Sequence, residues 1–443
     1  MLKKNEKVNV EVSEWAEKGL ALGVLDNQSV VLPFSAPGDS GWVHITKPGR
    51  SRAFAKWETL EKSASCRVKA PCDVFGKCGG CQLQHVDAGT QSTYKENRVT
   101  TAFQVAGLPE PDIFVHPVTM PVGYRNKVQF SFAKSREGQV LVGLTAPRSQ
   151  RVIDAQNCEI AHPLINKIVA QVRQFMFENE IPIFDEGYPG MAHLVVRVGI
   201  HTNEAMVGLV SNLGELPEQE KMVALLRSVP EVKSIYHVKN PDPTWQILAG
   251  EDVLLWGSPT IKETLGGIDL EISLRSFFQA NPSASEVLWA RVIALMNPQS
   301  SDTILDLYCG TGTIGLFLAK GAGQVIGIES SKEAVKNAEQ NAKANSITNC
   351  RFVAGDVDQE MEKITEACKG VVLNPPRQGA SSAVLAAIIK EKIETVVYVS
   401  CAPDSLSRDL KILSEAGYKI ESVECVDLFP QTYHVETVVL LKI

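Results

Sequence analysis

Residues 303–315, TILDLYCGTGTIG, join an apolar segment to a turn with two glycines and then to further apolar residues. The run from Thr303 to Leu307 predicts a buried strand, and the residues from Gly315 onward predict a helix. Gly310 and Gly312 allow the backbone of the turn to approach a ligand closely. A strand, a glycine turn and a helix in this order predict the start of a doubly wound α/β domain.

The alternation of strands and helices continues beyond this segment. Four more apolar runs each end on a polar or reactive residue, and these residues are Glu329, Asp356, Asn374 and Cys401. A parallel sheet with right-handed crossovers brings such residues to one edge, where ligands bind. The turn lacks the third glycine of the dinucleotide-binding motif. Its absence favours S-adenosyl-L-methionine over NAD as the ligand. Ser330 and Glu333 have the spacing of a capping box for the helix that follows.

Composition places the chain among ordinary globular proteins. Of its 443 residues, 44% are hydrophobic and 21% are charged, and neither a signal peptide nor a long apolar run is present. We therefore expect a cytoplasmic protein without a membrane partner. Residues 1–150 carry 19 Lys and Arg against 14 Asp and Glu, whereas the rest carries 25 against 37. This uneven charge is compatible with binding phosphates but does not require it.

Three cysteines form a close cluster, Cys72-x5-Cys78-x2-Cys81, with glycines between them. Cys158 is the natural fourth ligand, and four thiolates suit zinc or an iron–sulfur cluster. Three close ligands and one distant one favour iron–sulfur over zinc. Cys66 is a spare that could replace Cys72. The x5 gap argues against the Cys-x3-Cys-x2-Cys spacing of radical enzymes.

The remaining patterns predict three domains. Short strands and regular turn residues in 1–65 predict a five-stranded OB-like β-barrel, a fold that commonly binds single-stranded nucleic acid, although a spacer role fits the pattern equally well. Strand and helix patterns without regular alternation predict a central α+β domain in 66–265. Its basic strand residues, among them Arg125 and Lys127, could contact phosphates or face solvent. The doubly wound domain occupies 266–443.

With these residues in hand, the chain resembles the RNA 5-methyluridine methyltransferase family, in particular its iron–sulfur 23S ribosomal RNA members with an N-terminal TRAM barrel. The resemblance covers nearly the whole chain. Its motifs are the cluster cysteines, SFFQANP (276–282), DLYCGTG (306–312), LNPPRQGA (373–380), YVSCAP (398–403) and FPQTYHVET (429–437). Many members have Asp in place of Asn374, which keeps a polar side chain but removes a charge.

The resemblance implies a specific reaction and site. Cys401 would be the nucleophile that attacks carbon 6 of uracil, and Glu436 the base that removes the proton from carbon 5. The expected residues of the cofactor site are Gln279, Tyr308, Glu329, Asp356 and Asn374, with Asn374 near the transferred methyl. The expected ligands of a [4Fe-4S] cluster are Cys72, Cys78, Cys81 and Cys158. From its place in the sequence alone, His434 is a second candidate for proton transfer, with a structural histidine as the alternative.

The expected partner is RNA, with 23S ribosomal RNA as the first choice. The target uridine is expected in a single strand or a loop, from which it can flip out. We expect a monomer. A transfer RNA substrate remains an alternative. An amino-methyltransferase that uses Asn374-Pro375-Pro376 is a second alternative, but Arg377 stands where such motifs carry an aromatic residue. A third is a non-catalytic RNA-binding iron–sulfur protein with a degenerate methyltransferase fold.

Overall fold

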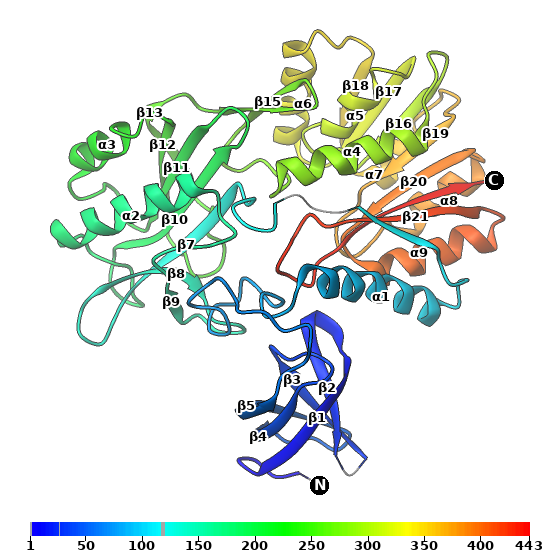
Figure 1. Cartoon of the computed structure of the whole chain (residues 1–443). Coiled ribbons are helices and arrows are strands. Elements are labelled where there is room, and N and C mark those ends of the chain that lie inside the picture. Colours follow the sequence, from blue (N-terminus) through cyan, green and yellow to red (C-terminus); the bar gives the residue numbers. More distant parts are fainter. Residues whose placement is uncertain (1, 26, 117–119) are drawn as a thin grey trace.

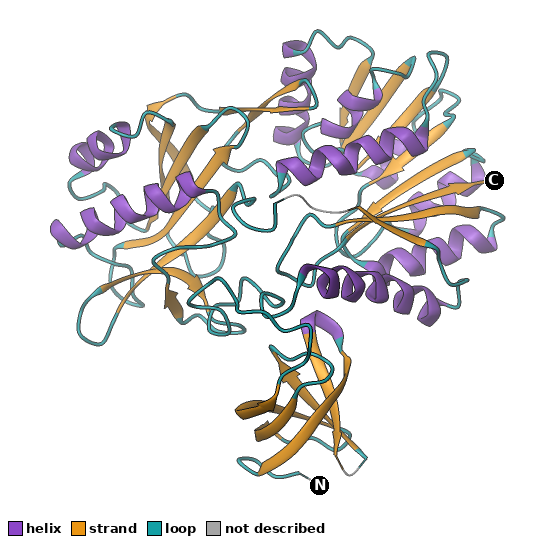
Figure 2. Cartoon of the chain, viewed as in Figure 1, coloured by secondary structure: helices purple, strands orange, loops and turns teal. Residues whose placement is uncertain are grey.

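The computed structural model describes residues 2–25, 27–116 and 120–443. Three bodies of secondary structure follow one another along the chain: a small barrel, a seven-stranded sheet with two helices, and an eight-stranded sheet covered by helices (Figures 1 and 2). Within the described residues, every helix is too short or too polar to cross a membrane.

The N-terminal strands form a closed barrel in the order β1-β2-β3-β5-β4, which confirms the predicted five-stranded barrel. Alternate side chains point inward, so valine, leucine, isoleucine and alanine fill its interior. The strands are β1 (Lys7–Trp15), β2 (Leu20–Leu25), β3 (Gln28–Pro33), β4 (Ser40–Lys47) and β5 (Arg52–Lys62), with a short 3-10 helix η1 (Glu17–Gly19) between the first two.

Polar contacts fasten the barrel to the rest of the molecule. The Tyr94 hydroxyl accepts a hydrogen bond from the Gly19 N–H at 2.8 Å and donates one to the Ala16 carbonyl at 3.1 Å. The Arg67 guanidinium contacts both carboxylate oxygens of the buried Asp39, at 2.7 and 2.8 Å. A bidentate pair of this kind fixes orientation as well as distance.

The central sheet has the order β13-β12-β11-β10-β7-β8-β9, and only β11 and β12 pair in parallel. Helices α2 and α3 pack on one face, over a core of valine, isoleucine, leucine and phenylalanine. The elements are β7 (Lys127–Lys134), β8 (Val140–Thr145), β9 (Val152–Asp154), α2 (Pro163–Glu178), β10 (Met191–Gly199), β11 (Glu204–Ser211), α3 (Gln219–Arg227), β12 (Val232–Lys239) and β13 (Glu251–Gly257).

The C-terminal sheet has the order β18-β17-β16-β19-β20-β22-β21-β6, and β22 alone is antiparallel to its neighbours. This is the predicted doubly wound sheet. Its strands are β16 (Thr303–Leu307), β17 (Gln324–Glu329), β18 (Cys350–Ala354), β19 (Gly370–Leu373), β20 (Thr395–Ser400), β21 (Lys419–Val426) and β22 (Glu436–Lys442). Its helices are α4 (Pro282–Met296), α5 (Thr313–Leu318), α6 (Lys332–Ala344), α7 (Val357–Met361), α8 (Ser382–Lys390) and α9 (Pro403–Glu415).

Each face of this sheet has its own apolar core. Helices α4, α5 and α6 cover one face, and α7, α8 and α9 cover the other (Figure 1). A hairpin of β14 (Ile261–Leu265) and β15 (Ile268–Ile272) contacts both the central sheet and α6. Gly266 and Gly267 form its two-residue turn, and both have positive φ, at 49° and 73°, which glycine adopts without strain.

An early segment of the chain joins the C-terminal sheet. Helix α1 (Ala88–Ala106) packs against α9, and β6 (Ile113–His116) pairs in parallel with β21 as the eighth strand. Val99 and Phe103 are buried in the same core as α8 and α9. The range 66–265 predicted for the central domain therefore differs from the packing, because α1 and β6 bury their apolar side chains against the C-terminal sheet.

Candidate active site

A cavity of about 1460 Å³ opens at the carboxyl edge of the C-terminal sheet. It lies where the strand order reverses, between β16 and β19, which is the usual ligand site of an open α/β sheet. Gly312, with φ at 77°, ends the glycine turn below it; a Cβ there would lie 2.7 Å from the ring of Phe352. The turn therefore requires glycine at this position.

Glu329 is held firmly beside the glycine turn. One carboxylate oxygen accepts from the Gly310 N–H at 3.2 Å, and the other accepts from the Ser331 N–H at 2.8 Å and the Ser330 hydroxyl at 3.0 Å. Because Ser330 is used in this way, the N-cap of α6 is Ser331, whose hydroxyl accepts from the Ala334 N–H at 3.2 Å. The predicted cap at Ser330 is therefore wrong by one residue.

The other four residues predicted to bind the cofactor line the same cavity: Gln279, Tyr308, Asp356 and Asn374. Tyr308 directly follows β16 and has a positive φ of 63°. Asp356 caps the N-terminus of α7, and Asn374 directly follows β19, with its N–H bonded to the Leu307 carbonyl at 3.3 Å. The structure thus brings all five residues to one edge of the sheet.

Cys401 and Glu436 also line this cavity, from two adjacent strands. Ser400 in β20 pairs with Thr437 in β22, so one step further along this antiparallel ladder Cys401 faces Glu436. Glu436 is only 3% exposed, and burial raises its pKa to about 8, although Arg377 opposes the shift. Burial, and then the nearby Glu436, raise the pKa of the half-buried Cys401.

Arg377 is a cavity residue to which the sequence analysis gave no part in the reaction. It lines the cavity, and its positive charge acts on both the Cys401 thiol and the Glu436 carboxyl. A cation at this place lowers the pKa of both groups and so favours their ionised forms. Its position in LNPPR, just after a strand that ends in the site, was the signal that could have identified it.

Buried polar groups hold the loop that carries Arg377. Asp409 is fully buried and accepts hydrogen bonds from the Tyr398 hydroxyl at 2.6 Å and the Ala380 N–H at 2.8 Å. The Ser405 hydroxyl donates to the Arg377 carbonyl at 3.0 Å. These contacts run from β20 and α9 to the loop, so the strand that presents Cys401 also orients Arg377.

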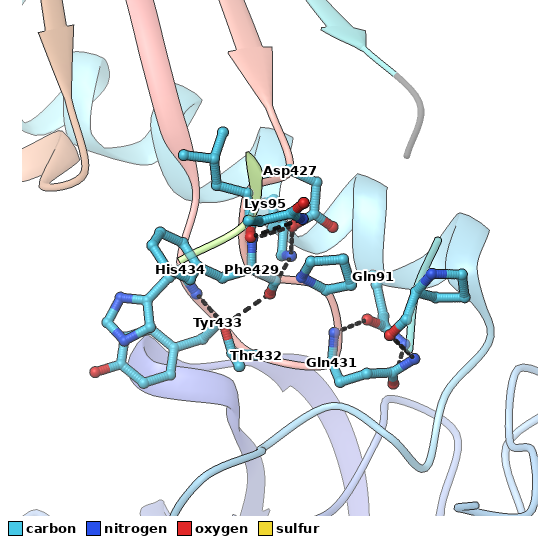
Figure 3. A network of polar contacts seen from close by, with 12 residues as sticks. Gln91, Lys95, Asp427, Phe429, Gln431, Thr432, Tyr433 and His434 are labelled. Carbon is cyan, nitrogen blue, oxygen red and sulfur yellow. Dashed lines mark hydrogen bonds and ion pairs between the residues drawn. The ribbon is translucent and has the colours of Figure 1, made fainter. Parts of the chain in front are cut away.

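A second loop, residues 427–435, leads into Glu436 and is held by α1 (Figure 3). The Lys95 ammonium, whose side chain is 1% exposed, contacts the Asp427 carboxylate at 2.6 Å and the Phe429 carbonyl at 3.2 Å. Gln91 and Gln431 exchange two hydrogen bonds, at 3.0 and 3.1 Å. The early helix therefore fixes the segment that presents the predicted base.

His434 lies in the same loop and lines the cavity. Burial, and then the positive charges of Arg377, Arg98, Lys95 and Arg125, lower its pKa to about 4. The imidazole is therefore neutral at neutral pH, but a pKa this low makes it a weak base. The structure places His434 in the cavity, and its role in proton transfer stays a prediction.

The four cysteines predicted as cluster ligands come together in a separate place. Cys72, Cys78, Cys81 and Cys158 line one small, mostly apolar cavity beside the central sheet. Cys66 lies elsewhere, against the apolar contacts between the barrel and α1. Among the described residues, no group of three or more His, Cys, Asp or Glu side chains is arranged as metal ligands. The donor chemistry suits a cluster, but the ligand geometry of one is not present.

Comparisons with known proteins show the family of the chain. The profile of the family described as tRNA (uracil-5-)-methyltransferase matches residues 267–443. An uncharacterized RNA methyltransferase of Halalkalibacterium halodurans is 35% identical, over 99% of this chain and 98% of the relative, and one of Enterococcus faecalis is 36% identical, over 99% and 98%. The chain belongs to the RNA 5-methyluridine methyltransferase family.

A solved structure of this family has the same fold. The crystal structure of the Pyrococcus abyssi tRNA (uracil-54, C5)-methyltransferase in complex with S-adenosyl-L-homocysteine is 27% identical and has a TM-score of 0.79, covering 98% of this chain and all of that one. Family membership leaves the amino-methyltransferase alternative without support.

Proposed function

We propose that this protein methylates carbon 5 of a uridine in RNA, with S-adenosyl-L-methionine as methyl donor and 23S ribosomal RNA as the first candidate substrate. The observation that carries the proposal is the pair of Cys401 and Glu436 on adjacent strand ends, facing the cavity that holds the five predicted cofactor residues. Transfer RNA is the second candidate, because the solved relative acts on uracil-54 of tRNA.

In this proposal the Cys401 thiolate adds to carbon 6 of uracil and makes carbon 5 nucleophilic. S-adenosyl-L-methionine, when bound, supplies the methyl group. Glu436 then takes the proton from carbon 5, and the bond between Cys401 and carbon 6 breaks to release the product. Arg377 favours the ionised forms of both side chains, and the buried site limits the access of water to the carboxylate.

A covalent intermediate provides the sharpest test of this reaction. The Glu436→Gln variant should still attack and transfer the methyl group, but it lacks an acceptor for the proton. A protein–RNA adduct should therefore accumulate and survive denaturing gels. RNA with 5-fluorouridine at the target should trap the wild-type protein, because fluorine does not leave as a cation. Cys401→Ala should form no adduct. Normal methylation without an adduct on the fluorinated RNA would rule out the mechanism.

The RNA substrate is decided by mapping the modification. Mass spectrometry of ribosomal and transfer RNA from a deletion strain should show one 5-methyluridine lost from 23S ribosomal RNA and restored by the wild-type gene, but not by one encoding Cys401→Ala. Loss from transfer RNA instead would select the second candidate. No loss from either RNA would contradict the proposed function.

We also propose that Cys72, Cys78, Cys81 and Cys158 hold a [4Fe-4S] cluster. Their convergence on one small cavity supports this proposal, as does the glycine-rich loop between Cys78 and Cys81. Thiolates are the ligands that iron–sulfur clusters use. Within the chain, the cluster would join the loop before α1 to the segment before α2.

A further inference from the structure

Three basic side chains gather on one face of the central sheet. Lys127 begins β7 and lies directly opposite Arg197 of β10 in the antiparallel ladder. Arg125 lies two residues before Lys127, and its Nε donates to the Lys127 carbonyl at 3.0 Å. Like charges directly across a ladder repel each other. This arrangement therefore destabilises the sheet unless an anion lies between the charges.

The described residues supply no such anion. Burial, and then Arg197 and Arg125, lower the pKa of Lys127 to about 7, and no carboxylate opposes the shift. Arg197 is 2% exposed; burial alone lowers its pKa to about 10, and its Nε has no hydrogen-bond partner. Buried charges are normally paired. An unpaired basic cluster is better explained by a ligand than by the stability of the fold.

The cluster adjoins the proposed active site. Arg197 donates to the carbonyls of Ser273 and Ser276, at 2.8 and 2.7 Å, and so holds the start of the segment that runs on to Gln279. The Asn126 amide donates to the Gln279 carbonyl at 3.0 Å. Arg125 itself lines the cavity that contains Cys401. An anion bound at the cluster would therefore lie beside the cavity.

We propose that Arg125 and Lys127, supported by Arg197, bind a backbone phosphate of the RNA strand next to the nucleotide that enters the cavity. The inference rests on the proposed function, because it takes RNA as the substrate. A phosphate supplies the missing counter-charge, and arginine and lysine are the side chains that bind it. Arg197 holds the segment that starts at Ser273 in place and adds its positive charge from the strand next to Lys127.

The proposal makes binding depend on pH. Lys127 is partly neutral near pH 7 in the free protein, and the charged groups that act on it are Arg125 of the same strand face and Arg197 of β10. A bound phosphate favours the charged form, so the complex takes up a proton. RNA affinity should therefore fall as the pH rises from 7 to 9.

Salt-dependent binding tests the site. The RNA is a fragment that the wild-type protein methylates, and its affinity is measured by fluorescence anisotropy over a series of salt concentrations. Lys127→Gln should weaken binding about 5- to 10-fold at low salt and reduce the slope of log K against log salt by about one. Lys134→Gln, at the exposed far end of β7, is the matched control and should change neither. Affinity for S-adenosyl-L-methionine reports whether each variant is folded.

Two further arms make the test specific. Lys127→Arg should keep the affinity and the salt slope but lose the decrease between pH 7 and 9. If the Lys127→Gln variant still forms the 5-fluorouridine adduct and shows the same salt slope as the wild type, the phosphate site is overturned and the proposed function stays intact. If inorganic phosphate binds the wild type and not Lys127→Gln while both proteins bind RNA equally well, that outcome assigns the site to a free anion and overturns the proposal. A wild type that methylates no RNA would overturn the proposed function itself.

Discussion

At the scale of single residues, the burial that prepares Glu436 for its proposed role as a base also lowers the stability of the folded protein as the pH rises. A buried carboxylate with a raised pKa stabilises the fold fully below its unfolded pKa, near 4.5, and this stabilisation is lost as the pH rises towards 8. At pH 8 the folded protein therefore contains a poorly solvated negative charge at Glu436. The proposed base requires this charge, because only the ionised carboxylate can accept a proton. Arg377 reduces this cost but does not remove it.

The Glu436→Gln variant should therefore unfold less readily than the wild type, and increasingly so as the pH rises. Gln resembles the protonated acid, so the difference in the free energy of unfolding should grow by at most about 1.4 kcal/mol per pH unit between pH 5 and 8. Thermal or denaturant unfolding at several pH values measures this difference. Glu415→Gln, on the exposed face of α9, should show no such trend. A constant difference across this range would contradict the raised pKa.

At the scale of elements, helix α1 acts on the site through the loop that precedes β22. Lys95→Met would leave the partly buried Asp427 carboxylate without its ammonium partner, a loss that costs at most about 3–5 kcal/mol, the value typical of a fully buried pair. We expect kcat to fall at least 10-fold while the affinity for S-adenosyl-L-methionine stays near the wild-type value, because this loop carries Glu436 and not the glycine turn. Steady-state kinetics and calorimetric titration separate these two effects.

Two controls accompany this prediction. Adding Asp427→Asn to Lys95→Met removes the unpaired charge, so the double variant should regain part of the stability and of kcat. Asn97→Ala, on the exposed side of α1, should leave both unchanged. If kcat is unaffected by Lys95→Met, the network holds the fold but does not position Glu436.

These elements also show what the sequence alone could predict. The glycine turn and the polar residues at strand ends depend on local patterns, and the structure brings them together as expected. The pairing of β6 with β21 joins residues about 300 positions apart, and no local pattern carries that information. Arg377 differs, because its position just after a strand that ends in the site is a local signal; only its effect on Cys401 and Glu436 depends on residues distant in the sequence.

At the scale of the whole molecule, the loop of residues 72–81, which we call the cysteine loop, links the central sheet to the C-terminal body. Cys78 and Cys81 face the small cavity beside the central sheet, Gly79 lines the large active-site cavity, and Gly80 lines both. The N–H groups that follow, of residues 82 and 83, donate to the Gln431 carbonyl at 3.0 and 2.9 Å. A cluster held by these cysteines would therefore stiffen the loop that supports Glu436.

The last prediction follows from this position. Protein purified without oxygen should be brown and contain iron and sulfide in near-equal amounts. Cys158→Ala should lose the iron, lower the melting temperature and reduce kcat, because the cysteine loop then loses its link to the segment before α2. Cys66→Ala, a cysteine outside the small cavity, should keep the iron and the activity. A colourless wild-type protein with one zinc ion would contradict the cluster, and full activity of an iron-free Cys158→Ala would show that the cluster does not support the active-site loop.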